Sequence, residues 1–226
     1  MKRLYSLYCV VLFSTLSLAT LGVNLLVPSL KGRRRVAGTF SRGFFAAAGI
    51  PLAVDGLDRL PDAPCVVVAN HASYIDGIVA AAALPPDFAF VVKREMVRVP
   101  LASLLLRGLG SAFVERFDRH KGGSDARRVW KLAATGQSLV FFPEGTFNGA
   151  RQVGRFLNGA FATATRSSLP IVPVAIHGTR EVLPTGSRMI HRRPIRLEVL
   201  GVLAPDGARE RSREMIAAAV GEPLAP

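Results

Sequence analysis

Residues 4–30 form a long apolar run without a charged residue, and this run limits what the chain can fold into more than any other feature. A helix of about 20 apolar residues crosses the hydrocarbon core of a bilayer, so the run is long enough to span one. Basic residues flank it on both sides: Lys2 and Arg3 before it, Lys31 and residues 33–35 after it. Because positive charge at both ends favours neither orientation, the run predicts an anchor that either spans the membrane or turns back within one leaflet.

A cleaved secretory signal is the competing interpretation of this run, because a basic start followed by an apolar core also fits one. The run is long for such a signal, however, and no clear small-x-small cleavage site precedes Lys31. The basic, phenylalanine-containing segment at residues 33–50 predicts a second helix that is amphipathic and interfacial. We therefore expect a membrane anchor at residues 1–50 and one domain of ordinary size at residues 51–226.

Composition narrows the class of partner. Half of the 226 residues are hydrophobic (50%), the mean hydropathy is +0.31 and the formal net charge is +13. Such a chain is typical of a membrane-associated protein, and its charge predicts an anionic partner, either a membrane surface or an acidic carrier protein. Nucleic acid is disfavoured, because the basic residues are dispersed and no nucleic-acid motif is present. Cys9 and Cys65 fit neither a disulfide framework nor a metal site.

Past the anchor, short apolar runs alternate with helix-like segments. The expected strands are residues 65–69, 88–93, 111–115, 138–142, 171–176 and 195–203. The expected helices are residues 74–84, 101–109, 125–135, 160–168 and 209–220. This alternation predicts an α/β fold with a mixed, largely parallel sheet flanked by helices. Sheets of this kind bind ligands beyond the carboxyl ends of their strands.

The motif NHASYID, at residues 70–76, lies at a predicted turn from a strand to a helix. His71 is a candidate general base there, and Asp76 is a candidate to orient its imidazole. Ser73 and Asp76 also have the spacing of a helix capping box, so the aspartate has a structural interpretation of its own. The two interpretations are compatible, because a capped aspartate is held rigidly and can still orient a histidine.

Two further motifs follow near the ends of predicted strands: GSAFVER at residues 110–116 and FFPEGT at residues 141–146. Each has a structural interpretation when taken singly. Arg116 is compatible with an ordinary solvated surface charge, although a guanidinium also suits a phosphate. Glu144, Gly145 and Thr146 are compatible with a simple turn, in which the glycine supplies an unusual backbone conformation.

The order and spacing of these motifs resemble the glycerolipid acyltransferase superfamily, which includes the 1-acylglycerol-3-phosphate acyltransferases. The family's blocks are NHxSxxD, GxxFxxR, FPEGT and an apolar block with a proline, here Pro173. The resemblance covers residues 60–180. It implies that His71 is the general base acting on an acceptor alcohol and that Asp76 holds its tautomer and stabilises the imidazolium.

The resemblance also implies a set of substrate contacts. These are Asn70, Ser73, Gly110, Phe113, Arg116, Glu144, Gly145, Thr146 and Pro173. Arg116 would hold an acceptor phosphate, and Glu144 and Gly145 would shape the acceptor pocket. A turn amide near Pro173 would stabilise the oxyanion.

The implied reaction moves a fatty acyl group from acyl-CoA or acyl carrier protein to the hydroxyl of a lysophospholipid. No other cofactor and no metal is expected, and no serine or cysteine nucleophile is needed if the alcohol attacks directly. The favoured acceptor is 1-acylglycerol-3-phosphate, which gives phosphatidate. The expected location is the cytoplasmic face of a bacterial inner membrane.

The chain departs from the family at two places, and these keep the acceptor open. Phe147 stands where many lysophosphatidate enzymes have arginine or serine, and residues 156–159 lack the lysine often found there. Either Arg151 or Arg155 replaces these cations, or the acceptor is another lysolipid, such as a lyso-ornithine lipid.

Two other classes of protein stay open from the sequence alone. A lipid hydrolase is disfavoured, because no GxSxG motif supplies a nucleophile. A non-catalytic membrane-surface protein explains the charge and the anchor but not the ordered motifs. Convergence of His71, Asp76, Arg116 and Glu144 on one cleft distinguishes an enzyme from these alternatives.

Overall fold

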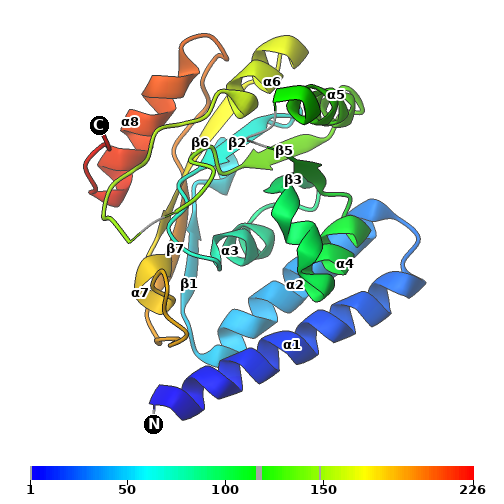
Figure 1. Ribbon diagram of the computed structural model, residues 1–226, viewed down its shortest axis with the longest axis vertical. Coiled ribbons are helices and arrows are strands. Elements are labelled where there is room, and N and C mark those ends of the chain that lie inside the picture. Colours follow the sequence, from blue (N-terminus) through cyan, green and yellow to red (C-terminus); the bar gives the residue numbers. More distant parts are fainter. Residues whose placement is uncertain (1, 116–118, 148) are drawn as a thin grey trace.

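The computed structural model describes residues 2–115, 119–147 and 149–226, with the backbone alone at residues 119–124. In these residues helices cover both faces of a central sheet (Figure 1). The helices are α1 (Lys2–Leu26), α2 (Leu30–Ala48), α3 (Asp76–Ala83), α4 (Pro100–Gly108), α5 (Arg119–Ala134), α6 (Gly159–Ser167), α7 (Thr179–Val182) and α8 (Ala208–Val220). The strands are β1 (Leu52–Asp55), β2 (Val66–Ala69), β3 (Phe88–Lys93), β4 (Ala112–Val114), β5 (Ser138–Phe141), β6 (Ile171–His177) and β7 (Ile195–Val199). Two short 3₁₀ helices, η1 (Leu57–Arg59) and η2 (Arg94–Arg98), complete the described elements.

The sheet has seven strands in the order β1-β7-β6-β2-β5-β3-β4. Every neighbouring pair is parallel except β6 with β7, which is antiparallel. The mixed, largely parallel sheet that the sequence predicts is thus confirmed. Because β6, β2, β5, β3 and β4 run in one direction, their carboxyl ends lie at the same edge of the sheet.

The central strand β2 is apolar throughout because helices cover both of its faces. Val66 and Val68 belong to a cluster with residues of α6 and α8, and Val67 and Ala69 belong to a cluster with residues of α2 and α3. Side chains alternate between the faces of a strand, so a strand covered on both faces has no position for a polar residue. The buried strand gives the loop that follows it a rigid base.

The first two helices form a hairpin. Pro28 separates them, and the Ser29 side chain caps α2 by accepting a hydrogen bond from the backbone N–H of Gly32, at 3.1 Å. Phe44 and Phe45 of α2 are buried in the same cluster as Val67 of the sheet. The second helix that the sequence predicts is therefore present and packs on the sheet layer, while the boundary at residue 50 stays a prediction.

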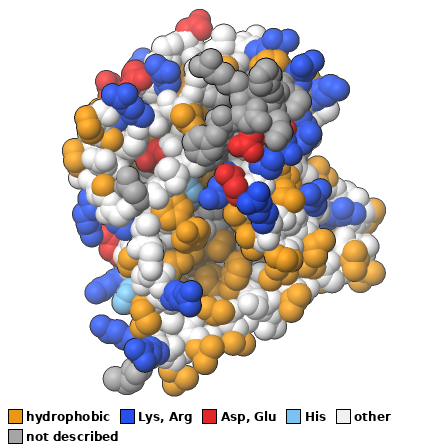
Figure 2. All heavy atoms as spheres, viewed as in Figure 1, with side chains coloured by type: hydrophobic (Ala, Val, Ile, Leu, Met, Phe, Trp, Pro, Cys, Tyr) orange, Lys and Arg blue, Asp and Glu red, His pale blue; other side chains and the backbone are white. Residues whose placement is uncertain are grey.

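Helix α1 has its polar and apolar sides reversed relative to a helix of a soluble core. Its buried residues are mostly small or polar: Ser6, Cys9, Ser17, Thr20 and Asn24. Its most exposed residues include large apolar ones, namely Leu4, Leu7, Leu18, Leu25 and Leu26. Hydrophobic side chains gather on the part of the surface over α1 and α4 (Figure 2). By length and composition α1 is the one described helix suited to cross a membrane.

Several element boundaries differ from those expected. Strand β1 was not expected, because its four residues bury only alternate side chains at the edge of the sheet. Strand β7 ends at Val199 rather than at residue 203, where only an isolated bridge from Leu203 to Ile171 continues the pairing. Helix α5 begins at Arg119, earlier than expected, because the glycine pair at 122–123 does not stop it.

Candidate active site

Three loops of the sheet's carboxyl edge bring the candidate residues together. Strand β2 lies between β5 and β6 and is parallel to both. His71 follows β2, Glu144 follows β5, and Arg180 lies in α7 after β6. All three residues line one cavity of about 130 Å³. The convergence follows from strand order, because adjacent parallel strands place their following loops side by side.

His71 and Asp76 form a hydrogen-bonded pair. The imidazole Nδ1 lies 2.8 Å from Asp76 Oδ2, and the His71 side chain is 21% exposed while that of Asp76 is fully buried. A carboxylate at this distance fixes the proton on Nδ1 and leaves Nε2 as the basic nitrogen. The pair therefore has the arrangement of a general base with its orienting partner.

The turn around Asp76 is held by the backbone. Asp76 Oδ2 also accepts hydrogen bonds from the N–H groups of Ala72, at 2.7 Å, and Ser73, at 2.8 Å. The Ser73 hydroxyl does not cap α3 as the sequence predicts; it donates to the carbonyl of Leu183, at 2.8 Å. Only the aspartate half of the expected capping box is present, because the hydroxyl is drawn to the loop after α7. Helix α3 accordingly begins at Asp76 rather than at residue 74.

Glu144 ties the second motif to the first. Its Oε1 accepts from the N–H of His71, at 2.7 Å, and its Oε2 accepts from the N–H of Gly154, at 2.8 Å. Burial raises the pKa of Glu144 above its usual value, although the two backbone donors counteract part of this shift. The carboxyl group therefore fixes two walls of the cavity relative to each other.

Two glycines are required by this geometry. Gly145 has φ of 78°, in the left-handed region that side chains other than glycine rarely adopt. At Gly154 a Cβ atom would lie 2.7 Å from Glu144 Oε2, so any larger residue would displace the carboxylate. Gly154 was not singled out in the sequence, and nothing in its local pattern separates it from an ordinary loop glycine.

Two aromatic rings pack against the His71 imidazole. Phe142 stacks on the imidazole with a centroid distance of 4.7 Å, and Phe147 meets it edge-on at 4.6 Å. Tyr74, which is exposed, meets Phe147 at 4.7 Å. Phe147, the residue that departs from the family motif, thus packs an apolar ring directly against the His71 imidazole.

The cavity itself is lined mainly by polar groups. Its lining residues are His71, Glu144, Thr146, Ala150, Gln152, Gly154 and Arg180. Thr146 was expected at the site, and Gly145 forms the turn beside it. Gln152 and Arg180 were not expected. The signal for Arg180 was its position just beyond the apolar block that ends a predicted strand next to the one that carries His71.

Asn70 and Pro173 are not among the residues that line the cavity, and both make contacts within the sheet. The Asn70 amide donates to the carbonyl of Ile176, at 2.9 Å, and accepts from the N–H of the same residue, at 2.8 Å. It thereby extends the pairing of β2 with β6 past the end of β2. Pro173 pairs with Val68 inside β6, so the turn that the sequence predicts near it is replaced by strand.

Gly110 and Phe113 do not line the cavity. Gly110 adopts a left-handed conformation after α4, and a Cβ there would meet the Leu30 side chain of α2 at 3.0 Å. Phe113 is buried on the edge strand β4, with the Arg107 guanidinium 5.5 Å from its ring centroid. Arg116 lies outside the described residues. Because β4 is parallel to β3, its carboxyl end lies at the same edge of the sheet as His71.

The arginines expected to replace a missing phosphate contact lie elsewhere. Arg151 is 70% exposed in its side chain and pairs with Glu181, at 2.9 Å. Arg155 donates through Nε to the carbonyl of Pro226, at 2.8 Å. Neither is among the residues that line the cavity.

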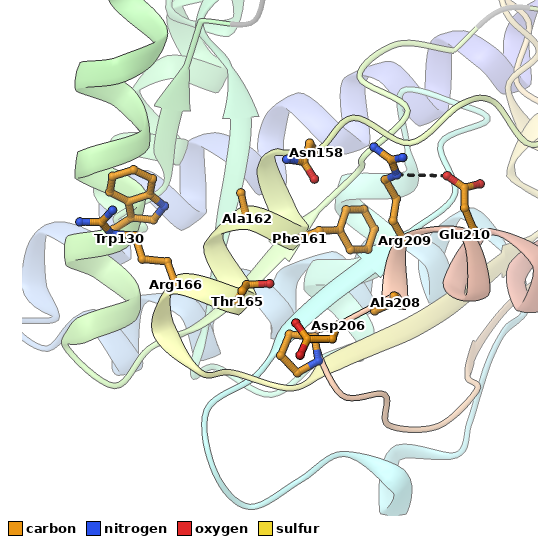
Figure 3. Close-up of a pocket in the computed structure, with 12 residues that line it drawn as sticks. Trp130, Asn158, Phe161, Ala162, Thr165, Arg166, Asp206, Ala208, Arg209 and Glu210 are labelled. Carbon is orange, nitrogen blue, oxygen red and sulfur yellow. Dashed lines mark hydrogen bonds and ion pairs between the residues drawn. The ribbon is translucent and has the colours of Figure 1, made fainter.

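A second, wider hollow lies away from these residues. Its volume is about 700 Å³, and it lies among α5, α6 and the start of α8 (Figure 3). Arg166 of α6 covers the ring of Trp130 of α5, at 4.0 Å from the centroid. None of the expected site residues lines it, so the small cavity beside His71 is the candidate active site.

The arrangement suits base catalysis without an enzyme nucleophile. Burial raises the pKa of the Cys65 thiol to about 11, and Cys9 is buried in α1, so neither cysteine is an active nucleophile. Within the described ranges, no group of His, Cys, Asp and Glu side chains is suited to hold a metal ion. The cavity combines the His71 imidazole, the Arg180 side chain and space for a small polar group.

Comparisons with known proteins agree with this geometry. The Acyltransferase family profile matches residues 51–177, more than half of the chain. A chloroplastic 1-acyl-sn-glycerol-3-phosphate acyltransferase of Brassica napus is 34% identical over 139 residues, which are 61% of this chain and 40% of that protein. A human 1-acyl-sn-glycerol-3-phosphate acyltransferase beta is 29% identical over 215 residues, 89% of this chain and 74% of that protein.

A solved structure shares the fold. The crystal structure of the 1-acyl-sn-glycerophosphate acyltransferase of Thermotoga maritima superposes with a TM-score of 0.83 at 22% identity, covering 97% of this chain and 95% of that one. The chain spans about two fifths of the length of the plant relative. The matching profile covers the strands that carry His71, Glu144 and the end of β6, and the chain therefore belongs to the acyltransferase family.

Proposed function

We propose that the protein transfers a fatty acyl group from an acyl thioester to the hydroxyl of a lysophospholipid at a membrane surface. The observation that carries this proposal is the His71–Asp76 pair, whose Nδ1 to Oδ2 distance is 2.8 Å and whose histidine lines the cavity. In the proposed reaction, His71 Nε2 takes the proton of the acceptor hydroxyl as its oxygen attacks the thioester carbonyl. The tetrahedral intermediate then collapses, and the departing thiolate receives that proton from the imidazolium.

Asp76 supports this cycle through its charge. A buried carboxylate against Nδ1 stabilises the imidazolium that forms when the hydroxyl loses its proton. A positioned base of this kind contributes about 10² to 10⁴-fold to the rate. The buried cysteines and the absence of a GxSxG motif favour direct attack by the alcohol over an acyl-enzyme intermediate.

The favoured acceptor is 1-acylglycerol-3-phosphate. The names of the plant and human relatives support this choice, and Arg116 of the GSAFVER motif is the phosphate contact that the sequence motif proposes. One observation favours a different lysolipid as the second candidate. Phe147 places an apolar ring 4.6 Å from the imidazole, where the family motif often has a cation.

The proposed location is the cytoplasmic face of a bacterial inner membrane, with α1 in contact with lipid. The exposed leucines of α1 and the net charge of +13 support binding to an anionic bilayer. The acyl donor is acyl-CoA or acyl carrier protein. The same basic surface suits both donors, because each carries negative charge.

An acyl-transfer assay on the purified full chain in mixed micelles tests this function. Labelled acyl-CoA and acyl carrier protein are each supplied with lysophosphatidate, lysophosphatidylglycerol, lysophosphatidylethanolamine and a lyso-ornithine lipid. We expect transfer with kcat/KM highest for lysophosphatidate. Preference for the ornithine lipid would assign the chain to the second candidate, and hydrolysis of the thioester without transfer to any lysolipid would contradict the proposal.

A further inference from the structure

Arg180 is the cationic side chain that the described structure places in the cavity with the catalytic histidine. Strand β6 is parallel to β2 and directly beside it, so the residues that follow the two strands meet at one edge of the sheet. Arg180 and His71 accordingly line the same cavity of about 130 Å³. Arg180 is the only lysine or arginine among the described residues of that lining.

The guanidinium of Arg180 is held in place before any substrate arrives. Its Nη1 donates to the carbonyl of Ala150, at 2.6 Å, and its Nη2 donates to both carboxylate oxygens of Glu222, at 3.1 and 3.3 Å. The side chain is only 12% exposed. A charge fixed in this way costs little side-chain entropy on binding, and partial burial strengthens its interaction with an anion.

The size of the cavity suits a headgroup rather than an acyl chain. A water molecule occupies about 30 Å³ in the liquid, so the cavity has room for roughly four waters. A phosphate group fits such a volume, whereas a fatty acyl chain needs a longer apolar channel. The lining also supplies the Thr146 hydroxyl and the Gln152 amide, which are hydrogen-bonding groups and not apolar surface.

The His71 imidazole has both apolar and polar neighbours. Phe142 and Phe147 pack against the ring, and His71 lines the same cavity as Arg180. Arg151 and Arg155, which are closer to the FPEGT motif in sequence, are engaged with Glu181 and Pro226 outside the cavity. Arg180 of α7, which follows β6, thus supplies a cation to the cavity, whereas Phe147 supplies none.

We propose that Arg180 binds the phosphate of the lysolipid acceptor in addition to the contact proposed for Arg116, and that it contributes to the selection of an anionic headgroup. This inference rests on the proposed acyl transfer to a lysophospholipid. The positive charge of the guanidinium attracts a phosphate, and its place in the cavity draws the headgroup toward His71. The sn-2 hydroxyl, a short distance from the phosphate along the glycerol, is then placed at Nε2.

The test compares Arg180→Gln with Arg180→Lys and with Arg151→Gln as the matched control. Arg151 lies near by in space but pairs with Glu181 outside the cavity. Initial rates are measured with lysophosphatidate and with uncharged monoacylglycerol as acceptors. We expect Arg180→Gln to raise KM for lysophosphatidate roughly tenfold to hundredfold, as for loss of a charged hydrogen bond, and to leave KM for the acyl thioester unchanged. Arg180→Lys should restore part of this loss, and Arg151→Gln should behave like the native protein.

A purely structural role for Arg180 predicts a different pattern. If Arg180 served only to tie the loop at residue 150 to Glu222, then Glu222→Gln would reproduce the loss seen in Arg180→Gln. On our proposal, Glu222→Gln leaves the cation in the cavity and keeps the preference for lysophosphatidate over monoacylglycerol. Thermal melting of each variant shows that it is folded. Equal loss of kcat on both acceptors in Arg180→Gln and Glu222→Gln, with KM unchanged, would overturn the proposal.

Failure of the underlying function gives a separate result. If the native protein acylates no lysolipid, the proposed function itself fails. If the native protein acylates lysophosphatidate and Arg180→Gln does so with the same KM and the same preference over monoacylglycerol, only the role of Arg180 fails.

Discussion

Helix α1 and the turn after β2 both bury polar side chains, but they do so for opposite reasons. In the turn, Asp76 is fully buried and one of its oxygens accepts hydrogen bonds from His71 and from two backbone N–H groups. In α1, Asn24 is buried with neither amide atom bonded to any described residue, while leucines of the same helix face outward. In the turn, donors surround a buried charged oxygen, whereas in α1 the buried polar side lies opposite an exposed apolar side.

The difference shows which surroundings each region requires. A buried carboxylate is stable only when donors compensate for the loss of water, and the turn after β2 supplies three of them to Asp76 Oδ2, although Oδ1 has no partner among the described residues. An exposed row of leucines is unfavourable in water but favourable in lipid, where α1 would bury it. The protein itself thus stabilises one carboxylate oxygen of the turn after β2, whereas the exposed leucines of α1 require a lipid environment.

The largest effect is expected where the catalytic turn loses its base. His71→Ala should lower kcat by about 10² to 10⁴-fold, because the acceptor hydroxyl is then no longer deprotonated by a positioned imidazole. His191→Ala, a histidine that does not line the cavity, is the matched control. Initial rates with lysophosphatidate and acyl-CoA measure the effect, and circular dichroism checks the fold. A His71→Ala variant that turns over near the native rate would show that the pair is structural.

Contact between α1 and lipid can be tested by introducing a charged residue on the exposed side of the helix. Leu18→Asp should reduce binding to vesicles of phosphatidylglycerol and phosphatidylethanolamine by roughly tenfold or more, because burying a leucine contributes about 1.5 to 3 kcal/mol and a charge opposes insertion. The control is Leu224→Asp, an exposed leucine two residues before the C-terminus, and that end of the chain lies beside α8, away from α1 (Figure 1). Vesicle co-sedimentation gives the partition coefficients. Equal binding by both variants would mean that α1 does not contact the bilayer.

Removal of the Asp76 carboxylate should destabilise the protein, because two backbone donors of the turn would lose their acceptor. Asp76→Ala leaves the N–H groups of Ala72 and Ser73 buried without their acceptor. We expect the free energy of unfolding to fall by roughly 2 to 4 kcal/mol, since each unsatisfied buried donor costs about 1 to 3 kcal/mol. Denaturant titration in a fixed detergent measures the change. A loss below about 0.5 kcal/mol would show that these donors are solvated in the native protein.

The smallest effect is expected at the polar side of α1. Asn24→Leu replaces a buried amide without described partners by an apolar group of similar size, so it should raise the free energy of unfolding by about 1 kcal/mol. A melting temperature higher by roughly 2 to 4 °C would accompany this change. A destabilised Asn24→Leu variant would instead indicate that the amide is hydrogen-bonded, and the contrast with Asp76 would weaken.

The sequence predicts the turn after β2 better than it predicts the walls of the cavity. His71, Asp76 and Glu144 stand in local motifs at strand ends, so the sequence predicts that they lie at one edge of the sheet, and the strand order then places them side by side. Gln152 and Gly154 reach the cavity through loop packing, which no local pattern encodes, and the only signal for Arg180 was its position after the last apolar block. Gly110 and Phe113 belong to the same motifs, yet the structure uses them against α2 and α4.

The orientation of α1 relative to the rest of the protein also could not be predicted from the sequence. Composition alone indicates a helix suited to a membrane, but it does not say which side faces the protein. The small and polar residues Ser6, Ser17 and Thr20 recur at a spacing that places them on one side, and this side packs on the rest of the molecule. The boundary between anchor and domain blurs for the same reason, since α2 shares its core with the sheet.

Direct attack by the acceptor, with His71 as the base, is most directly tested by looking for an acylated enzyme. The native protein is mixed with labelled acyl-CoA in the absence of acceptor, quenched and measured by intact-mass spectrometry, and lysophosphatidate is then added to a parallel sample. The account predicts an unchanged protein mass in the first sample and labelled phosphatidate in the second. A labelled protein that forms and decays as fast as turnover would contradict it.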